Sequence, residues 1–215
     1  GTEESFIKKM NERAKELGLK NTHFVNTNGL PAENHFSTAH DIAVMSRELL
    51  KHEEITKYTS IYQDYLRKDS NRPFWLVNTN KLVRFYPGAD GLKTGYTAEA
   101  KYCLSATAKK DNMRVVAVVM GEPNSKTRNS EITQMFDYAF ATYHSHPLVK
   151  KGDVITKIEI NKGSLPEVNL TAQHHFGILT KKGESIDDYE KEIVINPVVD
   201  APIKQGDILG HMFVK

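Results

Sequence analysis

The run Asp90-Gly91-Leu92-Lys93-Thr94-Gly95-Tyr96-Thr97 carries residue types that can bind the C-terminal end of a peptide. The Thr94 hydroxyl can donate a hydrogen bond to a carboxylate, and the Lys93 ammonium places a compact positive charge beside it. Gly95 has no side chain, so an extended peptide can approach the backbone closely and add to the sheet as a strand. The alternative is an ordinary edge strand with an exposed Lys and Thr. Because short triplets also arise by chance, the surrounding sequence decides between the two.

Several other runs accompany this triplet in a fixed order. They are Asn28-Gly29-Leu30-Pro31, Phe36-Ser37-Thr38-Ala39 with Asp41, Asn78-Thr79-Asn80 and Cys103. Together with Lys-Thr-Gly they resemble the low-molecular-mass penicillin-binding proteins of the D-alanyl-D-alanine carboxypeptidase family, and the resemblance covers the whole chain. The pair Ala100-Lys101, where many relatives carry Ala-Gly, points to the enzymes of spore-forming Gram-positive bacteria.

This family is marked by three motifs: S-x-x-K with the nucleophile, S-x-N, and K-T-G. Only the third has a convincing context here. Ser5 and Lys8 match S-x-x-K by letter, but they lie in an amphipathic helical repeat formed by Phe6, Met10, Ala14 and Leu17. The resemblance implies that Gly1 aligns just beyond S-x-N, so the nucleophilic Ser and its Lys lie upstream. We therefore expect no catalytic residue in this segment, which should be inactive without a companion N-terminal fragment.

The resemblance also implies roles for the residues of the third motif. Lys93 supplies charge, Thr94 a hydrogen bond, and the backbone N–H of Tyr96 one half of an oxyanion hole. Arg128 matches the family arginine that pairs with the terminal carboxylate of the substrate, a task that suits a planar guanidinium. By sequence alone, an Arg at a helix start is usually solvated. The predicted substrate-binding residues are Lys93, Thr94, Gly95, Tyr96 and Arg128.

In the resembled family, a serine hydrolase trims the terminal D-Ala of the peptidoglycan pentapeptide through an acyl-enzyme, without a cofactor. β-Lactams inhibit it by mimicking that substrate. The resemblance implies a secreted enzyme of cell-wall biosynthesis and cell shape at the outer face of the cell membrane. Relatives often carry a C-terminal membrane anchor, which is not present before Lys215. The main alternative is a non-catalytic cell-wall-binding or scaffold fragment. A β-lactamase is disfavoured because no deacylating Glu context is found.

Composition limits the remaining function classes. The 215 residues are 39% hydrophobic and 26% charged, as in a globular protein with room for two modest domains. A net charge of +2 with dispersed lysines gives no reason to expect nucleic acid. The nine histidines, including His144-Ser-His146 and His174-His175, lack metal-ligand spacing, so we expect no metal. The longest apolar run, Val115 to Met120, is too short to span a membrane. Cys103 is expected to be a buried structural thiol.

Periodicity predicts an α/β fold for the first part of the chain. One helix should run from a Thr2 cap to Gly18, and a second should follow a capping box of Thr38 and Asp41. Short irregular strands are expected over 55–83. Three longer strands should then cover Leu92 to Thr97, Tyr102 to Ala108 and Arg114 to Gly121, the last being central because it is continuously apolar. Asn78 and Asn80 either orient a loop near the cleft or, as we favour, satisfy turn backbone.

A third helix should begin at Ser125 and stop at His146-Pro147. We place a domain boundary there. The resemblance implies that residues 1–147 form the C-terminal part of a penicillin-recognising domain of the β-lactamase/transpeptidase type. Residues 148–215 form a small all-β domain. Its expected strands are Val154 to Ile160, Val168 to Thr171, Gly177 to Thr180, Ile193 to Asn196 and Ile208 to Val214.

Overall fold

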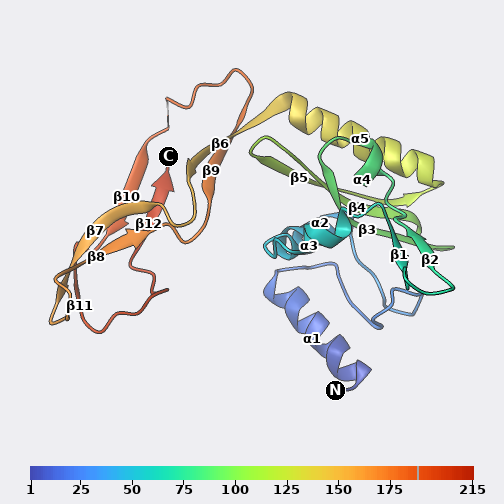
Figure 1. Cartoon of the computed structure of the whole chain (residues 1–215), viewed down its shortest axis with the longest axis horizontal. Helices are drawn as coiled ribbons and strands as arrows, with labels where there is room; N and C mark the ends of the chain where they lie inside the picture. Colours follow the sequence, from blue (N-terminus) through green and yellow to red (C-terminus); the bar gives the residue numbers. More distant parts are fainter. Residues whose placement is uncertain (188) are drawn as a thin grey trace. The chain divides into compact units, whose positions relative to one another are not determined.

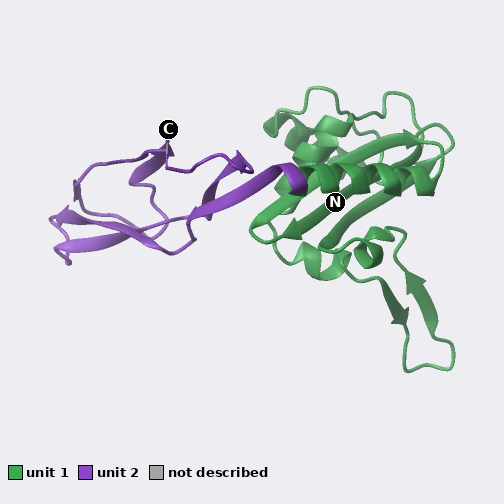
Figure 2. Cartoon of the chain, turned by 90° about the horizontal axis from the view of Figure 1, so that it is seen from above, with its two compact units in different colours: residues 1–140 green, residues 141–215 purple. Residues whose placement is uncertain are grey.

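A computed structural model describes residues 1–187 and 189–215 (Figure 1). The chain forms two compact units, residues 1–140 and 141–215 (Figure 2). Helices and strands mix in the first unit, and strands dominate the second, so the predicted α/β fold with a small β part is confirmed. The domain division after residue 147 stays a prediction, because compactness does not establish which part folds alone. No helix in the described residues is long and apolar enough to cross a membrane.

The first unit is organised around an antiparallel sheet of β3 (Ala89–Thr97), β4 (Lys101–Lys110) and β5 (Met113–Glu122), in that order. All three predicted strands are confirmed. Within the described residues β4 lies between the other two and β5 is an edge strand, so a central position for β5 in a longer protein stays a prediction. Helices nevertheless cover both faces of β5. Val119 belongs to the core cluster that includes α5 residues, while α2 packs against β5. Cover on both faces explains an apolar run in an edge strand.

Helix α5 (Ser125–Thr142) supplies much of the core on one face of the sheet. Ile132 and Phe136 are fully buried there, in the same cluster as Leu104 and Ala106 of β4. The helix ends at Thr142, and the predicted stop at His146-Pro147 is wrong. Both residues lie inside strand β6 (Tyr143–Val149). Proline forces extended backbone on the residue before it, a restriction that a strand also satisfies.

The first two helices begin where the sequence predicts. Thr2 caps α1 (Glu3–Glu16), and Thr38 caps α2 (Ala39–Leu49) by accepting a hydrogen bond from the Asp41 N–H at 3.2 Å. The carboxylate of Asp41 does not complete a capping box. It accepts instead from the Asn21 N–H at 2.9 Å and the Thr22 hydroxyl at 2.8 Å. Asp41 thereby anchors the preceding loop. Burial acts to raise the pKa of Asp41, but these donors outweigh it and the pKa is lowered.

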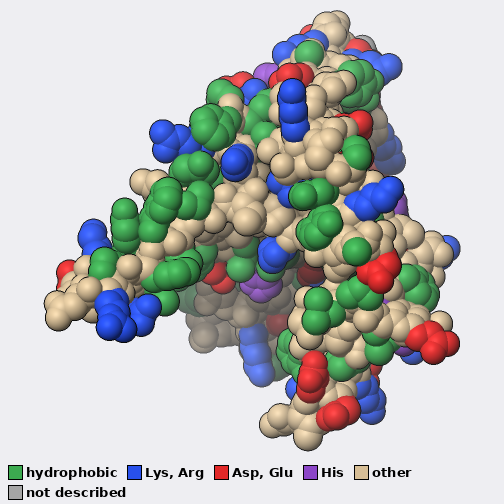
Figure 3. Space-filling view, turned by 90° about the vertical axis from the view of Figure 1, so that its right-hand side faces the viewer, with side chains coloured by type: hydrophobic (Ala, Val, Ile, Leu, Met, Phe, Trp, Pro, Cys, Tyr) green, Lys and Arg blue, Asp and Glu red, His purple; other side chains and the backbone are tan. Residues whose placement is uncertain are grey.

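Residues 55–83 contain helices that the sequence did not reveal. The elements here are α3 (Ile55–Thr59), β1 (Gln63–Leu66), β2 (Phe74–Val77) and α4 (Leu82–Phe85). The helices are too short to show periodicity, whereas the predicted short strands are present as a β1-β2 hairpin. Every residue of this hairpin's strands is exposed. The hairpin projects from the first unit (Figure 2), and hydrophobic side chains gather along it (Figure 3).

The second unit consists of short paired strands. Besides β6, they are β7 (Val154–Asn161), β8 (Glu167–Thr171), β9 (Phe176–Lys181), β10 (Lys191–Ile195), β11 (Val198–Asp200) and β12 (Gly210–Val214). They pair as β6-β9, β11-β7-β8 and β10-β12. The five predicted strands are confirmed, and β6 and β11 were missed. Buried positions include Ile158 and Thr180, whose hydroxyl lies 3.0 Å from His146 Nε2.

Candidate functional site

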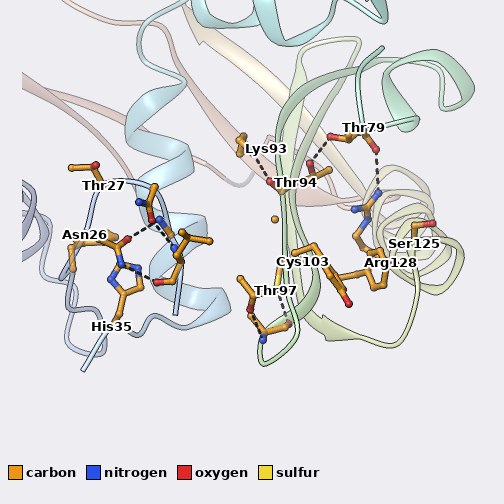
Figure 4. Close-up of a pocket in the computed structure, with 18 of the residues that line it drawn as sticks. Asn26, Thr27, His35, Thr79, Lys93, Thr94, Thr97, Cys103, Ser125 and Arg128 are labelled. Carbon is orange, nitrogen blue, oxygen red and sulfur yellow. Dashed lines mark hydrogen bonds between the residues drawn. The ribbon is translucent and has the colours of Figure 1, made fainter. Parts of the chain in front are cut away.

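A pocket of about 870 Å³ opens beside β3 in the first unit (Figure 4). Its volume falls within the range of pockets that hold small ligands, roughly 300–1,000 Å³. Segments distant in the sequence meet here: residues 24–30, the turn before α4, β3, the start of β4 and the first turn of α5. The lining includes all the residues predicted to bind substrate: Lys93, Thr94, Gly95, Tyr96 and Arg128. The structure thus brings them together, while their binding role stays a prediction.

The charge of the pocket is positive. Lys81, Lys93 and Arg128 line it, and no Asp or Glu is among the lining residues that the structure describes. A concave site lined by one sign of charge attracts ligands of the opposite sign. Sequence reasoning missed Lys81. The pocket is therefore suited to an anionic ligand.

Arg128 is 4% exposed, although it lies in the first turn of α5. Its Nε and Nη2 donate to Asn129 Oδ1 at 3.1 and 3.0 Å, and Nη2 also donates to the Thr79 carbonyl at 3.3 Å. No carboxylate in the described residues pairs with it. Burial lowers the pKa of Arg128, yet a guanidinium stays charged at neutral pH.

The unused donor of Arg128 indicates where a ligand can bind. Within the described residues, Nη1 has no hydrogen-bond partner, and no fully buried side-chain nitrogen or oxygen lacks one. Nη1 therefore reaches solvent at the pocket that Arg128 lines. A buried cation without a counter-ion is costly. An anionic ligand at Nη1 would reduce that cost.

Strand β3 offers its backbone to the same pocket. It pairs with β4 on one side, and no described strand pairs with its other edge. Lys93 is exposed and its Nζ lies 2.5 Å from the Thr94 carbonyl oxygen. A Cβ added at Gly95 would meet only Cys103 Cβ, at 4.0 Å, so internal packing does not demand glycine there. The absent side chain instead leaves the free edge open to an extended peptide.

Packing does demand glycine at the start of the same strand. A Cβ at Gly91 would lie 2.7 Å from Thr59 Oγ1 and 3.3 Å from Thr107 Cγ2. The neighbouring Asp90 is held by Arg114 through two hydrogen bonds of 2.7 and 2.8 Å. These contacts fix where β3 begins. The position of Lys-Thr-Gly two residues later follows from them.

The turn Asn78-Thr79-Asn80 joins the parts of the site. Asn78 Oδ1 accepts from the Asn80 N–H and Asn78 Nδ2 donates to the carbonyls of Thr59 and Ile61, so a role in turn backbone is confirmed for Asn78, whereas the bond from Asn80 to β3 fits the other role, which is to orient a loop near the cleft. Asn80 is 1% exposed and also donates to the Gly91 carbonyl at 2.8 Å, which ties the turn to β3. Between them, Thr79 Oγ1 lies 2.6 Å from Thr94 Oγ1. The run Asn78-Thr79-Asn80 was singled out in the sequence, but no role was predicted for Thr79.

Other candidates lie elsewhere or differ from expectation. Cys103 was predicted to be buried, but it is half-exposed and lines the pocket. Its partner on β3 is Gly95, which has no side chain to cover it. Ser5 and Lys8 are exposed on α1 and do not line the pocket. His35, which sequence reasoning passed over, lines the pocket and accepts from the Val25 N–H at 2.9 Å.

The remaining histidines give no sign of a metal site. His144 and His146 lie in β6 with ring centroids 4.6 Å apart. In the described part of the chain, no group of three or more His, Cys, Asp or Glu is arranged to hold an ion. Among the described residues, the pocket beside β3 combines positively charged side chains with the unpaired edge of a strand.

Comparison with known proteins gives consistent matches along the chain. Residues 1–124 match the family model "D-alanyl-D-alanine carboxypeptidase", and residues 143–215 match "Penicillin-binding protein 5, C-terminal domain". The D-alanyl-D-alanine carboxypeptidase DacF of Bacillus subtilis is 53% identical over all of this chain and 55% of its own length. This chain spans about half the length of the curated relatives it matches.

Solved structures agree with these matches. Penicillin binding protein 5 from Haemophilus influenzae superposes with a TM-score of 0.70 at 28% identity, over 98% of this chain and 60% of that one. The Streptomyces K15 DD-transpeptidase gives a TM-score of 0.60 at 33% identity, over 64% of this chain and 55% of that one.

Proposed function

Because the chain belongs to the D-alanyl-D-alanine carboxypeptidase family, we propose that it forms the substrate-binding part of a serine-type enzyme that removes the terminal D-Ala of peptidoglycan stem peptides. The observation that carries this proposal is Arg128, a buried cation without an anionic partner among the described residues, in one pocket with the open edge of β3. A peptide that ends in a free carboxylate has both features that this pocket can bind: an extended backbone and a terminal negative charge.

The proposed binding mode follows from the residues at the pocket. The peptide adds to the free edge of β3 beside Gly95, and its terminal carboxylate binds the Thr94 hydroxyl and Arg128. The ammonium of Lys93 supports the negative charge. The backbone N–H of Tyr96 donates to the oxygen of the scissile carbonyl when it becomes an oxyanion. β-Lactams, which carry a carboxylate beside a reactive carbonyl, bind in the same way.

The nucleophile, in this proposal, comes from outside these 215 residues, as the S-x-x-K serine and lysine of the complete enzyme. Ser125 lines the pocket, but in the described residues no hydrogen bond joins its hydroxyl to a general base. Ser5 does not line the pocket. The chain alone should therefore bind substrate without forming an acyl-enzyme. We place the complete enzyme at the outer face of the cell membrane, where its cell-wall substrate is found.

The second candidate is a non-catalytic fragment that binds cell wall or acts as a scaffold. The same lack of a nucleophile with its base in the pocket favours it. The test compares the complete protein, including the sequence upstream of Gly1, with the 215 residues alone. We expect fluorescent penicillin to label the complete protein, which also releases D-Ala from a stem peptide, and not to label the 215 residues. A complete protein that binds stem peptide but is never labelled would support the scaffold instead.

A further inference from the structure

We propose that Thr79 is a positioning residue that orients both the Thr94 hydroxyl and the Arg128 guanidinium toward a substrate carboxylate; this inference rests on the proposed function. Thr79 is the one described residue bonded to both. Its hydroxyl contacts Thr94 Oγ1 at 2.6 Å, and its carbonyl accepts from Arg128 Nη2 at 3.3 Å (Figure 4). A strand residue and a helix residue are thereby held by a single residue of a third segment.

The turn around Thr79 is rigid enough for this task. Asn78 donates to the carbonyls of Thr59 and Ile61 at 3.1 and 3.0 Å, and its Oδ1 accepts from the Asn80 N–H at 2.9 Å. The Asn80 amide is buried and donates to the Gly91 carbonyl at 2.8 Å. Both neighbours of Thr79 are therefore fixed. Geometry held by locked neighbours is what a precise binding site requires.

The direction of the hydroxyl bond decides what Thr94 can do. Each threonine hydroxyl has one hydrogen to donate and two lone pairs to accept with. If Thr94 donated to Thr79, it would have no hydrogen left for a carboxylate. If Thr79 donates to Thr94, the Thr94 hydrogen is free, and the chain of bonds strengthens its donation. We assign Thr79 as the donor when an anion is bound.

The contact with Arg128 adds a second constraint. Nη2 is engaged by the Thr79 carbonyl and by Asn129 Oδ1, which leaves Nη1 as the donor that faces the pocket. Because one rigid turn sets both groups, the distance between the Thr94 hydroxyl and the guanidinium is fixed. This spacing selects for a carboxylate at the end of the peptide and gives no benefit to a ligand without one.

The test uses the complete protein and two substrates with the same acyl group: a peptide that ends in a free D-Ala carboxylate, and a thioester without that carboxylate. Thr79→Val removes the hydroxyl and keeps the shape. Thr79 is exposed, so the substitution leaves the core intact. We expect Thr79→Val to lower kcat/KM for the peptide between about two- and ten-fold, mainly through KM, and to change the thioester by less than about two-fold. Thr79→Ser should restore the wild-type value.

Thr171→Val, an exposed substitution on β8 far along the sequence from the pocket residues, is the matched control and should resemble wild type. Three results would overturn the inference. They are wild-type kinetics of Thr79→Val on both substrates, equal losses on both substrates together with a lower Tm, and a failure of Thr79→Ser to restore activity. If the wild-type protein itself shows no preference for the carboxylate substrate, the proposed function fails, and the inference fails with it. The wild-type measurement therefore separates the two.

Discussion

Replacing Arg128 by Met should separate binding from stability. Methionine keeps most of the volume of the side chain but removes the charge and the donor at Nη1. Hydrogen bonds to a charged group are worth about 1.5–3 kcal/mol, so kcat/KM for a peptide with a free terminal carboxylate should fall about ten- to 150-fold. The thioester substrate without that carboxylate should lose less than about two-fold, because the charged hydrogen bond from Nη1 discriminates only when a carboxylate is present.

The free energy of unfolding should change much less than kcat/KM, since Arg128 is 4% exposed and has no acidic partner in the described residues. The substitution loses the hydrogen bonds to Asn129 and to the Thr79 carbonyl, worth about 1–3 kcal/mol together. It also removes a buried charge whose desolvation costs several kcal/mol. The relief of the desolvation cost therefore offsets the lost hydrogen bonds. We therefore expect Tm to fall by no more than about 4 °C, because about 1 kcal/mol shifts Tm by about 2–4 °C in a protein of roughly 150–250 residues and by less in a longer one.

The assay combines steady-state kinetics on both substrates with thermal unfolding of the complete protein. Lys126→Met removes an exposed cation from the same helical turn and is the control, with kinetics like those of wild type. Equal losses on both substrates would show that Arg128 supports the fold and not the carboxylate. A large fall in Tm would refute the argument that its charge is buried at a net cost.

Four further predictions follow from the same structure. Lys93→Ala should lower acylation of the complete protein by penicillin at least about a hundred-fold without changing Tm, because Lys93 is exposed and its charge acts at the reacting groups; normal acylation would exclude that role. Deleting residues 143–215 should leave acylation intact, since the pocket lies in the first unit; a folded but unlabelled product would contradict this. Asp41→Asn should lower the free energy of unfolding in urea at pH 7. Because the folded-state pKa of Asp41 is lowered, the aspartate stabilises above its unfolded pKa near 4, and the difference should shrink as pH falls below that value; a difference that grows in acid would reverse the sign. Finally, the outer edge of β5 is unpaired in the described residues, so the 215 residues alone should self-associate or pair with a companion fragment, and a monodisperse monomer in ultracentrifugation would count against it.

Strong local patterns predicted much of this fold. The caps at Thr2 and Thr38, the three strands of the central sheet and the apolar face of α5 all follow from side-chain chemistry within one element. The failures occur where the outcome depends on another element. β5 is an edge strand in the described residues, and its apolar run reflects helices that cover both its faces; from the sequence alone, such cover cannot be told from a neighbouring strand. The two helices of residues 55–85 are four and five residues long, less than the repeat that a periodicity needs.

In the candidate site, too, the residue types could be predicted from the sequence, whereas their burial depends on other elements. Lys93, Thr94, Gly95, Tyr96 and Arg128 were found through a family resemblance, and the structure places them along one pocket. The burial of Arg128 was not foreseen, because a helix start is normally solvated and the turn at Thr79, which contacts it here, comes from a distant part of the sequence. Cys103 was wrongly predicted to be buried for a related reason. Alternation along β4 indicates an inward side chain, but it does not show that the partner residue on β3 is Gly95, which has no side chain to cover the thiol.

The two glycines of β3 represent two kinds of constraint on how this chain can vary. At Gly91 any side chain collides with Thr59 and Thr107, so variants should be lost as folded protein. At Gly95 the interior has room for a methyl group, so variants should accumulate normally and be lost only as binders. A mutational scan read by cellular abundance would therefore miss Gly95, whereas a scan read by penicillin labelling would detect both. If the proposed function holds, Gly95 is accordingly the position of the two at which binding of a β-lactam can change without loss of the fold.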